Sequence, residues 1–538
     1  MNPRPDPFAP AAPHPPRPGL VWALVLVYLL VGLVGHDPWR GDDARHFGPV
    51  LAILNDQQWL IPHIAGEPFL DYPPLYYWVG ALTATLSGWL LPLHDAARLA
   101  SAVLLGLSLA LTAGAAQRVH GAHAGAAAIL LVLGTLGLVV HAHETQPLLA
   151  LMAAQAVVLW GASVTLTRPL GGAAAAGFGV GLAFLANGVS GALSTAPILL
   201  FLPGIAPSLL AAMVAGATAS AWLIPTWQAE PALLAQWWQG NLANAALHAE
   251  KLRDAEALLG LLGWFTWPLW PIAGWALWRE RRQLAQARWR ILCAAAALSL
   301  AMTLLTGPLR PANALPVLIP LALIAAAGVT TLRRGAANAF DWFAGMSFAA
   351  FALLVWLAWT SMTLAWPPGL TRHLDKIAPN FLLGDPLMPS LIGLALTAAW
   401  IARLATAKRS PYRGAISWAT GMTMLWCLAV ILLEPWFDHG KRYRPAVASL
   451  AAALAGETPT CLARINISRS LRVNLDYFAQ LRTHPFTGPD GRCDWVLVYG
   501  EQRPTALDSR WRERWHYQRG GGDKREDLRL YARAFTLD

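Results

Sequence analysis

Charged side chains gather in one short stretch that follows the first apolar run of the chain. The stretch 36–46 (HDPWRGDDARH) places the adjacent carboxylates of Asp42 and Asp43 beside Arg45 and a histidine. Ionisable side chains beside membrane-length apolar segments are energetically costly, so they mark functional sites by default. A carboxylate can accept a proton from a hydroxyl, and a guanidinium can bind a phosphate with paired N–H donors. A purely structural alternative is that either aspartate caps a helix over 44–54.

A further carboxylate, Asp71, precedes a double proline in the stretch 69–78 (FLDYPPLYYW). Proline is tolerated in the first turn of a helix, because the N–H groups of that turn have no intrahelical partner. The free N–H groups and the helix dipole also attract anions. We therefore expect this loop to combine carboxylates, an arginine and a helix N-terminus that activate a hydroxyl and hold a phosphate at the depth of the lipid headgroups.

The composition decides which kind of protein must position these residues. Of 538 residues, only 13% are charged and 56% are apolar, with four cysteines in all. Typical soluble proteins have about 25% charged residues, so a soluble multidomain enzyme is excluded. Disordered and disulfide-rich classes are excluded by the high apolar content and the few cysteines. The sequence predicts an all-α polytopic membrane protein.

Basic residues predict the topology. We expect about 13 membrane spans within residues 19–435, although several apolar runs are shorter than a perpendicular span needs. Whether the run 75–93 crosses the membrane or lies at its surface decides on which side every later loop lies. If the run lies at the surface, the arginine-rich loops are on the same side as the N-terminal tail, as the positive-inside rule favours. The tail 1–18 is then disordered and cytoplasmic, the loop 36–93 is periplasmic, and the site lies in that loop. The net charge of +10 is thus a topology signal, and no nucleic-acid partner is expected.

The residues 436–538 form a separate unit outside the membrane. Helix-like runs at 445–455 and 468–481 alternate with strand-like runs at 461–467, 495–500 and 528–533. This pattern predicts a small periplasmic α/β domain. Cys461 and Cys493 each begin a strand-like run, and adjacent parallel strands could bring them within disulfide range. Two buried thiols explain the same pattern, and the sequence leaves both readings open.

The loop motifs resemble those of a known family. DDARHF followed by WLIPHIAGEPFLDYPPLYYW resembles the first extracytoplasmic loop of the lipid-A aminoarabinose transferases, whose wider relatives include the protein mannosyltransferases. All are glycosyltransferases of the GT-C fold. Similar segments occur at 181–188 (GLAFLANG) and 315–323 (LPVLIPLAL), so the resemblance covers roughly residues 20–435. It implies inverting transfer of a sugar from a polyprenyl-phosphate carrier to a lipid A, polysaccharide or protein acceptor at the periplasmic face of the inner membrane.

The resemblance also implies roles for individual residues. Asp42 matches the first aspartate of the family loop and would be the general base, while Arg45 would bind the carrier phosphate. Asp43 and Asp71 replace family glutamates and would position the substrate or the loop. The full set of candidate substrate-binding residues is Asp43, Arg45, His63, Asp71, Tyr72 and Arg310.

Two positions depart from the family pattern. Tyr72 stands where relatives carry a lysine thought to contact the phosphate, and Asn187 replaces another family lysine. Neutralisation of the phosphate would then depend on Arg45 and on Arg310, which lies in an outer turn. These departures make a catalytically silent relative that acts in envelope assembly one alternative function.

Other candidates are weaker. His141, His143 and Glu144 could bind a divalent metal, but helix capping or interface contacts explain them as well. The paired aspartates likewise fit either a direct base or a divalent-cation site. The loop 227–257, with His248 and Lys251 among its polar residues, could contact an acceptor or be a solvated segment.

A transporter or flippase of a lipid-linked sugar is the alternative from another functional class. Transporters carry inverted repeats and charges near the middle of the membrane. Here the charged residues crowd the outer interface and the mid-helix segments are nearly free of them, which favours the enzyme. The expected partners are therefore the carrier-linked sugar, its acceptor and the surrounding membrane lipids.

Overall fold

A computed structural model of the chain describes residues 16–246, 260, 262–306, 310–457, 461–488, 491–519 and 526–533. Most of the predicted tail 1–18 and the polar residues His248, Lys251 and Arg253 lie outside the described residues. The helices of the apolar bundle are α1 (Pro18–Leu30), α4 (Leu93–His120), α5 (Ala124–Leu133), α7 (Leu148–Val164), α8 (Pro169–Thr195), α9 (Ile205–Ala229), α12 (Leu269–Arg279), α13 (Ala287–Leu305), α14 (Leu318–Val329), α15 (Arg334–Leu364), α17 (Leu387–Ala405) and α18 (Arg413–Lys441). Shorter helices connect them, namely α6 (Leu138–His141), α10 (Pro231–Ala245), α16 (Pro368–Ile377), η1 (Ala196–Phe201) and η3 (Pro311–Val317).

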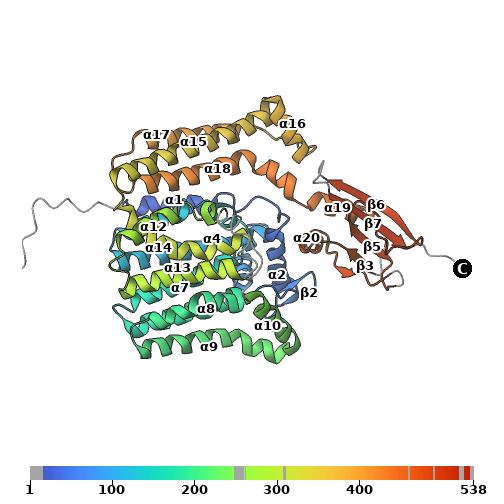
Figure 1. Cartoon of the computed structure of the whole chain (residues 1–538). Helices are drawn as coiled ribbons and strands as arrows, with labels where there is room; N and C mark the ends of the chain where they lie inside the picture. Colours follow the sequence, from blue (N-terminus) through green and yellow to red (C-terminus); the bar gives the residue numbers. More distant parts are fainter. Residues whose placement is uncertain are drawn as a thin grey trace, which may run out of the picture.

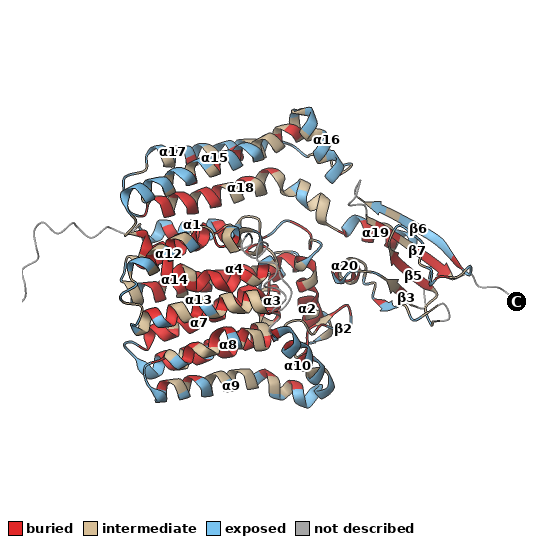
Figure 2. Cartoon of the chain, viewed as in Figure 1, coloured by how far each residue is buried: buried red, intermediate tan, exposed pale blue. Residues whose placement is uncertain are grey.

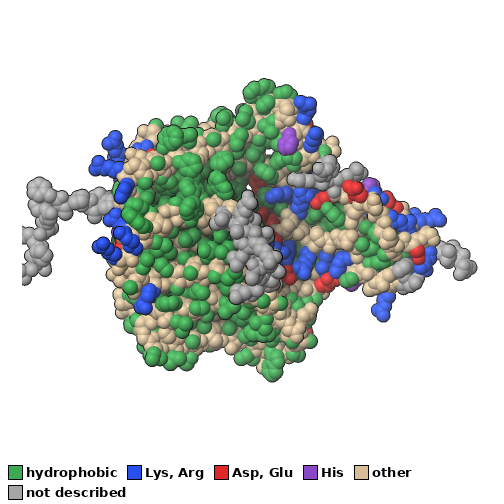
Figure 3. Space-filling view, viewed as in Figure 1, with side chains coloured by type: hydrophobic (Ala, Val, Ile, Leu, Met, Phe, Trp, Pro, Cys, Tyr) green, Lys and Arg blue, Asp and Glu red, His purple; other side chains and the backbone are tan. Residues whose placement is uncertain are grey.

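The bundle has the composition and exposure of a membrane domain. Among the described residues, eight helices are long and apolar enough to cross a membrane, and α1, α5 and α7 are shorter apolar helices. The peripheral helices α9, α15 and α17 expose most of their apolar surface, while α14 is buried inside the bundle (Figure 2). Figure 3 shows a hydrophobic band with lysine and arginine side chains gathered toward both ends of the molecule. Exposed apolar helices of this length are stable only in lipid, so the predicted polytopic membrane protein is confirmed.

Helix α8 contains a reversal of the chain. The backbone of Asn187 (φ −145°, ψ 24°) and Gly188 (φ 60°, ψ −139°) leaves the helical region. A Cβ atom on Gly191 would collide with the carbonyl oxygen of Ala183, which shows that the segments on either side of the turn fold back on each other. The apolar residues 171–186 and 189–204 are therefore the two arms of a helical hairpin. Glycine suits position 188 because its positive φ is unfavourable for other residues.

The loop 36–93 forms two helices and a hairpin at one end of the bundle. Helix α2 (Asp42–Asp56) begins after Gly41, which has a φ of 109°. The short strands β1 (His63–Ile64) and β2 (Glu67–Pro68) pair antiparallel before α3 (Leu75–Ser87). Helix α3 follows the double proline as predicted, and its 13 residues make it too short to count among the candidate spans. In Figure 1, α2 lies at the end of the bundle that faces the C-terminal domain.

The C-terminal domain has the predicted α/β character. Its helices are α19 (Arg444–Ala453) and α20 (Arg469–Ala479), and its strands are β3 (Leu462–Ile465), β4 (Thr483–Pro485), β5 (Trp495–Tyr499), β6 (Trp511–Arg519) and β7 (Glu526–Arg533). The sheet order is β4-β3-β5-β7-β6, and β3 and β5 are parallel neighbours. Strands β4 and β6 were not predicted. Helix α18 runs on to Lys441, so the predicted boundary at residue 436 falls inside a helix.

Cys461 and Cys493 form a disulfide, with their Cα atoms 4.8 Å apart. Each cysteine lies just before one of the two parallel strands β3 and β5. The bond therefore ties together the beginnings of two adjacent strands, which decides between the two readings that the sequence left open.

Candidate functional site

The two adjacent aspartates at the start of α2 have different surroundings. The carboxylate of Asp43 is buried and accepts hydrogen bonds from five donors. Arg98 on α4 donates two of them, from Nε (3.2 Å) and Nη2 (3.0 Å). The backbone N–H and the hydroxyl of Thr145 each donate at 2.8 Å, and the Trp39 N–H donates at 3.1 Å. A carboxylate has about four lone-pair sites, so Asp43 has no capacity left to accept a substrate proton.

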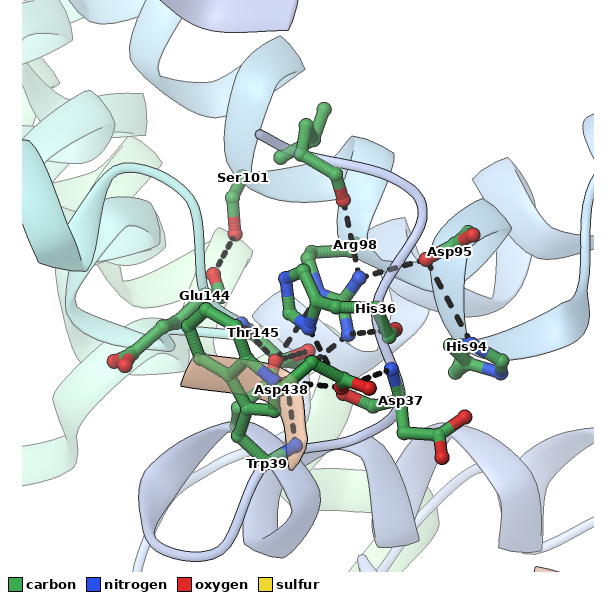
Figure 4. Close-up of polar contacts among 12 residues, drawn as sticks. His36, Asp37, Trp39, His94, Asp95, Arg98, Ser101, Glu144, Thr145 and Asp438 are labelled. Carbon is green, nitrogen blue, oxygen red and sulfur yellow. Dashed lines mark hydrogen bonds and ion pairs between the residues drawn. The ribbon is translucent and has the colours of Figure 1, made fainter. Parts of the chain in front are cut away.

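Arg98 connects this carboxylate to the rest of the loop. Its Nη1 donates to Asp95 Oδ1 (2.7 Å) and to the carbonyl oxygen of Leu33 (3.1 Å). Figure 4 shows Arg98 at the centre of these contacts, with Asp95 and Thr145 on different sides. We call Asp43, Asp95 and Arg98 the closed cluster. Burial alone would raise the pKa of Asp43, but the Arg98 guanidinium holds that pKa below its usual range.

Asp42 is the accessible carboxylate of the pair. About a third of its side chain is exposed, and its nearest cation, Arg45 Nη1, lies 3.7 Å away. That separation is longer than a hydrogen bond, so the oxygens of Asp42 stay available to a hydroxyl. Burial raises the pKa of Tyr72 to about 12, and the negative charge of Asp42 contributes to this increase.

Asp71 lies between two arginines from distant parts of the chain. Arg45 on α2 forms a close ion pair with Asp71 Oδ2, and Arg469 on α20 donates to the same oxygen at 2.8 Å. Both guanidinium groups also lie over the ring of Phe69, at 5.3 and 5.2 Å from its centroid. We call Arg45, Asp71 and Arg469 the open cluster, because Asp71 and Arg469 are partly exposed.

A cavity of about 280 Å³ joins the open cluster to the bundle. Its lining comes from the loop before α3, the α8 turn and the helices α7, α10, α13 and η3. Four residues singled out by the sequence meet in it, namely Asp71, Tyr72, Asn187 and Arg310. Asn241 also lines the cavity and accepts a hydrogen bond from the Val189 N–H (2.7 Å), which supports the α8 turn. The cavity therefore has many polar side chains in its lining, although it borders an apolar bundle.

Three guanidinium groups converge beside this cavity. Burial lowers the pKa of His46, and the positive charges of Arg45, Arg310 and Arg469 lower it further. The neutral ring of His46 lies 3.0 Å from the Tyr77 hydroxyl, through its Nδ1. Arg45 and Arg469 share Asp71, which lines the cavity together with Arg310, and this gathering of positive charge favours an anion.

The other predicted residues lie elsewhere. His63 belongs to β1, its Nδ1 lies 2.8 Å from the Ile61 carbonyl oxygen, and it is not among the residues that line the cavity. Both ring nitrogens of His143 contact backbone carbonyl oxygens, those of Val139 and Tyr28. Among the described residues, no group of three or more His, Cys, Asp and Glu side chains is arranged to hold a metal ion.

Comparisons with known proteins bear on the fold. No family model matches the chain. The curated undecaprenyl phosphate-alpha-4-amino-4-deoxy-L-arabinose arabinosyl transferase 1 of Pseudomonas fluorescens (strain Pf0-1) is 32% identical over 122 residues, or 23% of this chain. The match spans about a fifth (21%) of that relative.

The solved structure of ArnT from Cupriavidus metallidurans bound to undecaprenyl phosphate superposes with a TM-score of 0.67 and 16% identity. The superposition covers 95% of this chain and 97% of that one. The apo state of the same protein gives a TM-score of 0.64. This chain has the fold of ArnT. The resemblance to the aminoarabinose transferases is thereby confirmed at the level of the fold.

Two charged residues of the site, Arg98 and Arg469, were not predicted from the sequence. Arg98, Asp95 and His94 stand together at the start of an apolar run. Ionisable residues in such a place are a usable signal. Arg469 is one of many arginines in the C-terminal region, and its contact with Asp71 links residues 398 positions apart. Only the docking of the C-terminal domain brings it to the site.

Proposed function

We propose that this chain is an inner-membrane glycosyltransferase that uses an undecaprenyl-phosphate-type sugar donor. The observation that carries the proposal is the cavity, in which Asp71, Tyr72, Asn187 and Arg310 meet from three separate segments. Asp71, Tyr72 and Asn187 are positions that the resemblance to the family also points to. The ArnT fold supports the same function, because the ArnT structure of Cupriavidus metallidurans has undecaprenyl phosphate bound.

The reaction assigns a separate task to each charge. Asp42 accepts the proton of the acceptor hydroxyl, and the oxygen attacks the anomeric carbon of the sugar. The bond from that carbon to the carrier phosphate breaks, so the phosphate leaves with its negative charge. Arg45 and Arg310 stabilise this charge, since guanidinium groups bind phosphate oxygens in pairs. Asp42 fits the base better than Asp43, because Asp43 is buried and saturated with donors.

The proposed orientation places the cavity at the periplasmic face. The loops that carry Arg118, Arg168 and Arg333 then face the cytoplasm with the N-terminus, as the positive-inside rule favours. The C-terminal domain lies at the opposite end of the bundle (Figure 1). Its disulfide suits the oxidising periplasm.

The test compares purified wild type with Asp42→Asn, using undecaprenyl-phosphate sugars and lipid A, glycan and peptide acceptors. We expect Asp42→Asn to lower turnover by about 100-fold or more, with an unchanged unfolding temperature. Asp56→Asn is the matched control, because Asp56 ends the same helix and pairs with Arg482. Equal turnover of wild type and Asp42→Asn would reject the base assignment.

The same samples separate the alternatives. Movement of a lipid-linked sugar across vesicles without transfer would favour a flippase. Carrier binding without transfer to any acceptor would favour a silent relative in envelope assembly. Transfer measured with and without a chelator decides whether a divalent cation takes part, since paired aspartates can serve either chemistry.

A further inference from the structure

Helix α20 of the C-terminal domain is fixed against the first outer loop. The Gly41 N–H donates to Ser470 Oγ (3.2 Å), and that hydroxyl donates back to the Gly41 carbonyl oxygen (2.8 Å). Arg472 Nη2 contacts the Ile64 carbonyl oxygen (3.0 Å) and Glu67 Oε2 (2.8 Å). Val473 is buried in the same apolar core as the membrane bundle. The start of α20 is therefore held in a defined place beside the cavity.

Arg469 is the first residue of α20 and reaches the wall of the cavity. Its Nη1 lies 2.8 Å from Asp71 Oδ2, and Asp71 lines the cavity. Arg45 pairs with the same oxygen, so two guanidinium groups share one carboxylate. About half of the Arg469 side chain (49%) is exposed, which leaves donors free to reach a ligand. The guanidinium lies over Phe69, which orients its plane without neutralising its charge.

The charges around the cavity leave an excess of positive charge. Arg45 and Arg469 pair with Asp71, Arg45 lies 3.7 Å from Asp42, and Arg310 lines the cavity, so three guanidinium groups accompany two carboxylates. Tyr72 and Asn187 also line the cavity and contribute no charge. An anion with several acceptor oxygens would satisfy this arrangement better than a single carboxylate oxygen does. A phosphate monoester or diester has this chemistry.

We propose that Arg469 of the C-terminal domain binds the phosphate of the lipid carrier directly, together with Arg45 and Arg310. The inference rests on the proposed function and deepens it, because it makes the C-terminal domain part of the donor site. It also supplies a cation at Asp71, the residue that precedes the tyrosine at position 72. A weaker role for Arg469 would be to orient Asp71 without touching the ligand.

The experiment measures binding of undecaprenyl phosphate to the full-length protein in lipid nanodiscs. We expect Arg469→Ala and Arg469→Gln to weaken binding about tenfold, as the loss of one charge-assisted contact predicts. Arg482→Ala is the matched control. Arg482 also ties the C-terminal domain to α2, through Asp56 (2.8 Å), but Asp56 does not line the cavity, whereas Asp71, the partner of Arg469, does. Its loss should change binding less than about twofold.

The Asp71→Asn background separates direct binding from orientation of Asp71. A direct contact predicts that Arg469→Ala still weakens binding about tenfold when Asp71 is already Asn. Disappearance of the effect in that background would overturn the inference, as would equal effects of Arg469→Ala and Arg482→Ala. In both of these outcomes the wild type still binds the carrier, so the proposed function stands. A wild type that does not bind undecaprenyl phosphate would instead reject the proposed function itself.

Discussion

The closed and the open cluster use the same two residue types at the same end of the bundle. In the closed cluster, the side chains of Asp43, Asp95 and Arg98 are 1%, 4% and 1% exposed. In the open cluster, Arg45, Asp71 and Arg469 are 13%, 34% and 49% exposed. Asp42 and Asp43 are neighbours in sequence, yet a helix turns about 100° per residue, so one faces the open side and the other the bundle.

The difference between the clusters is one of burial. A buried charge must be fully paired, because nothing else compensates its lost hydration. The closed cluster satisfies this requirement and thereby joins α2 and α4 to the segment at Thr145. A partly exposed charge keeps some hydration and can exchange its partner at low cost. The first arrangement stabilises the fold, and the second is suited to ligand exchange.

The largest expected effect is on the closed cluster. Arg98→Ala leaves Asp43 and Asp95 buried without their cation, so we expect a loss of about 3–5 kcal/mol of stability. Thermal and detergent-induced unfolding of the purified protein measure it. Arg469→Ala removes an arginine from the open cluster and should cost about 1 kcal/mol or less. Equal destabilisation by the two substitutions would remove the distinction between the clusters.

The second prediction concerns the pH dependence that His36, which lies in the field of the closed cluster, gives to stability. Burial, followed by the positive charge of Arg98, lowers the pKa of His36 from 6.5 to about 3. The folded pKa lies below the unfolded one, so unfolding takes up a proton and stability falls as the pH decreases from about 6.5. From pH 7 to pH 5 this histidine should account for a loss of about 2 kcal/mol.

Unfolding temperatures of wild type and His36→Asn at pH 7 and pH 5 check this effect. Asp43 and His94 also face His36, and His46 is a second buried histidine with a lowered pKa. The variant should therefore lose part of the pH dependence and keep the remainder. Equal slopes for the two proteins would show that His36 does not titrate as the structure indicates.

The third prediction changes the open cluster without disturbing the fold. Asp71→Asn removes the carboxylate that Arg45 and Arg469 share, so both guanidinium groups become more available to an anion. We expect undecaprenyl phosphate to bind about three- to fivefold more tightly, with an unfolding temperature close to that of wild type. Asp43→Asn, the corresponding change in the closed cluster, should lower the unfolding temperature. Weaker carrier binding by Asp71→Asn would contradict the charge assignment.

The sequence predicted those features that local pattern determines. Apolar run length identified the bundle, and the double proline identified the start of α3. The motif around Asp42 and Asp71 identified the loop that borders the cavity. The sequence could not predict that Asp43 is buried and Asp42 accessible. This difference depends on Arg98 and Thr145, which lie 55 and 102 residues after Asp43.

The C-terminal domain also has features that the sequence could not predict. Its central strands have alternating or continuous apolar residues, a pattern that identifies a strand in the sequence. The edge strand β6 is rich in charged residues and lacks that pattern. Its arginines look equivalent in the sequence. Their partners Glu67, Asp71 and Asp56 become visible only when α20 lies on the outer loop.

The smallest expected effect comes from adding a charge to the cavity. Asn187 lies at the α8 turn and lines the cavity with Arg310, so Asn187→Lys would bring a fourth cation to the open side. A partly exposed charge pair is worth up to about 1 kcal/mol, which is up to about fivefold in carrier affinity. Asn187→Met has a similar length without the charge and serves as the control. Because charge in the open cluster should be interchangeable, Asn187→Lys should also recover part of the affinity lost in Arg469→Ala. Equal carrier affinities for the lysine and methionine variants would mean that position 187 does not face the phosphate, and the cavity would then bind its anion nearer to α20.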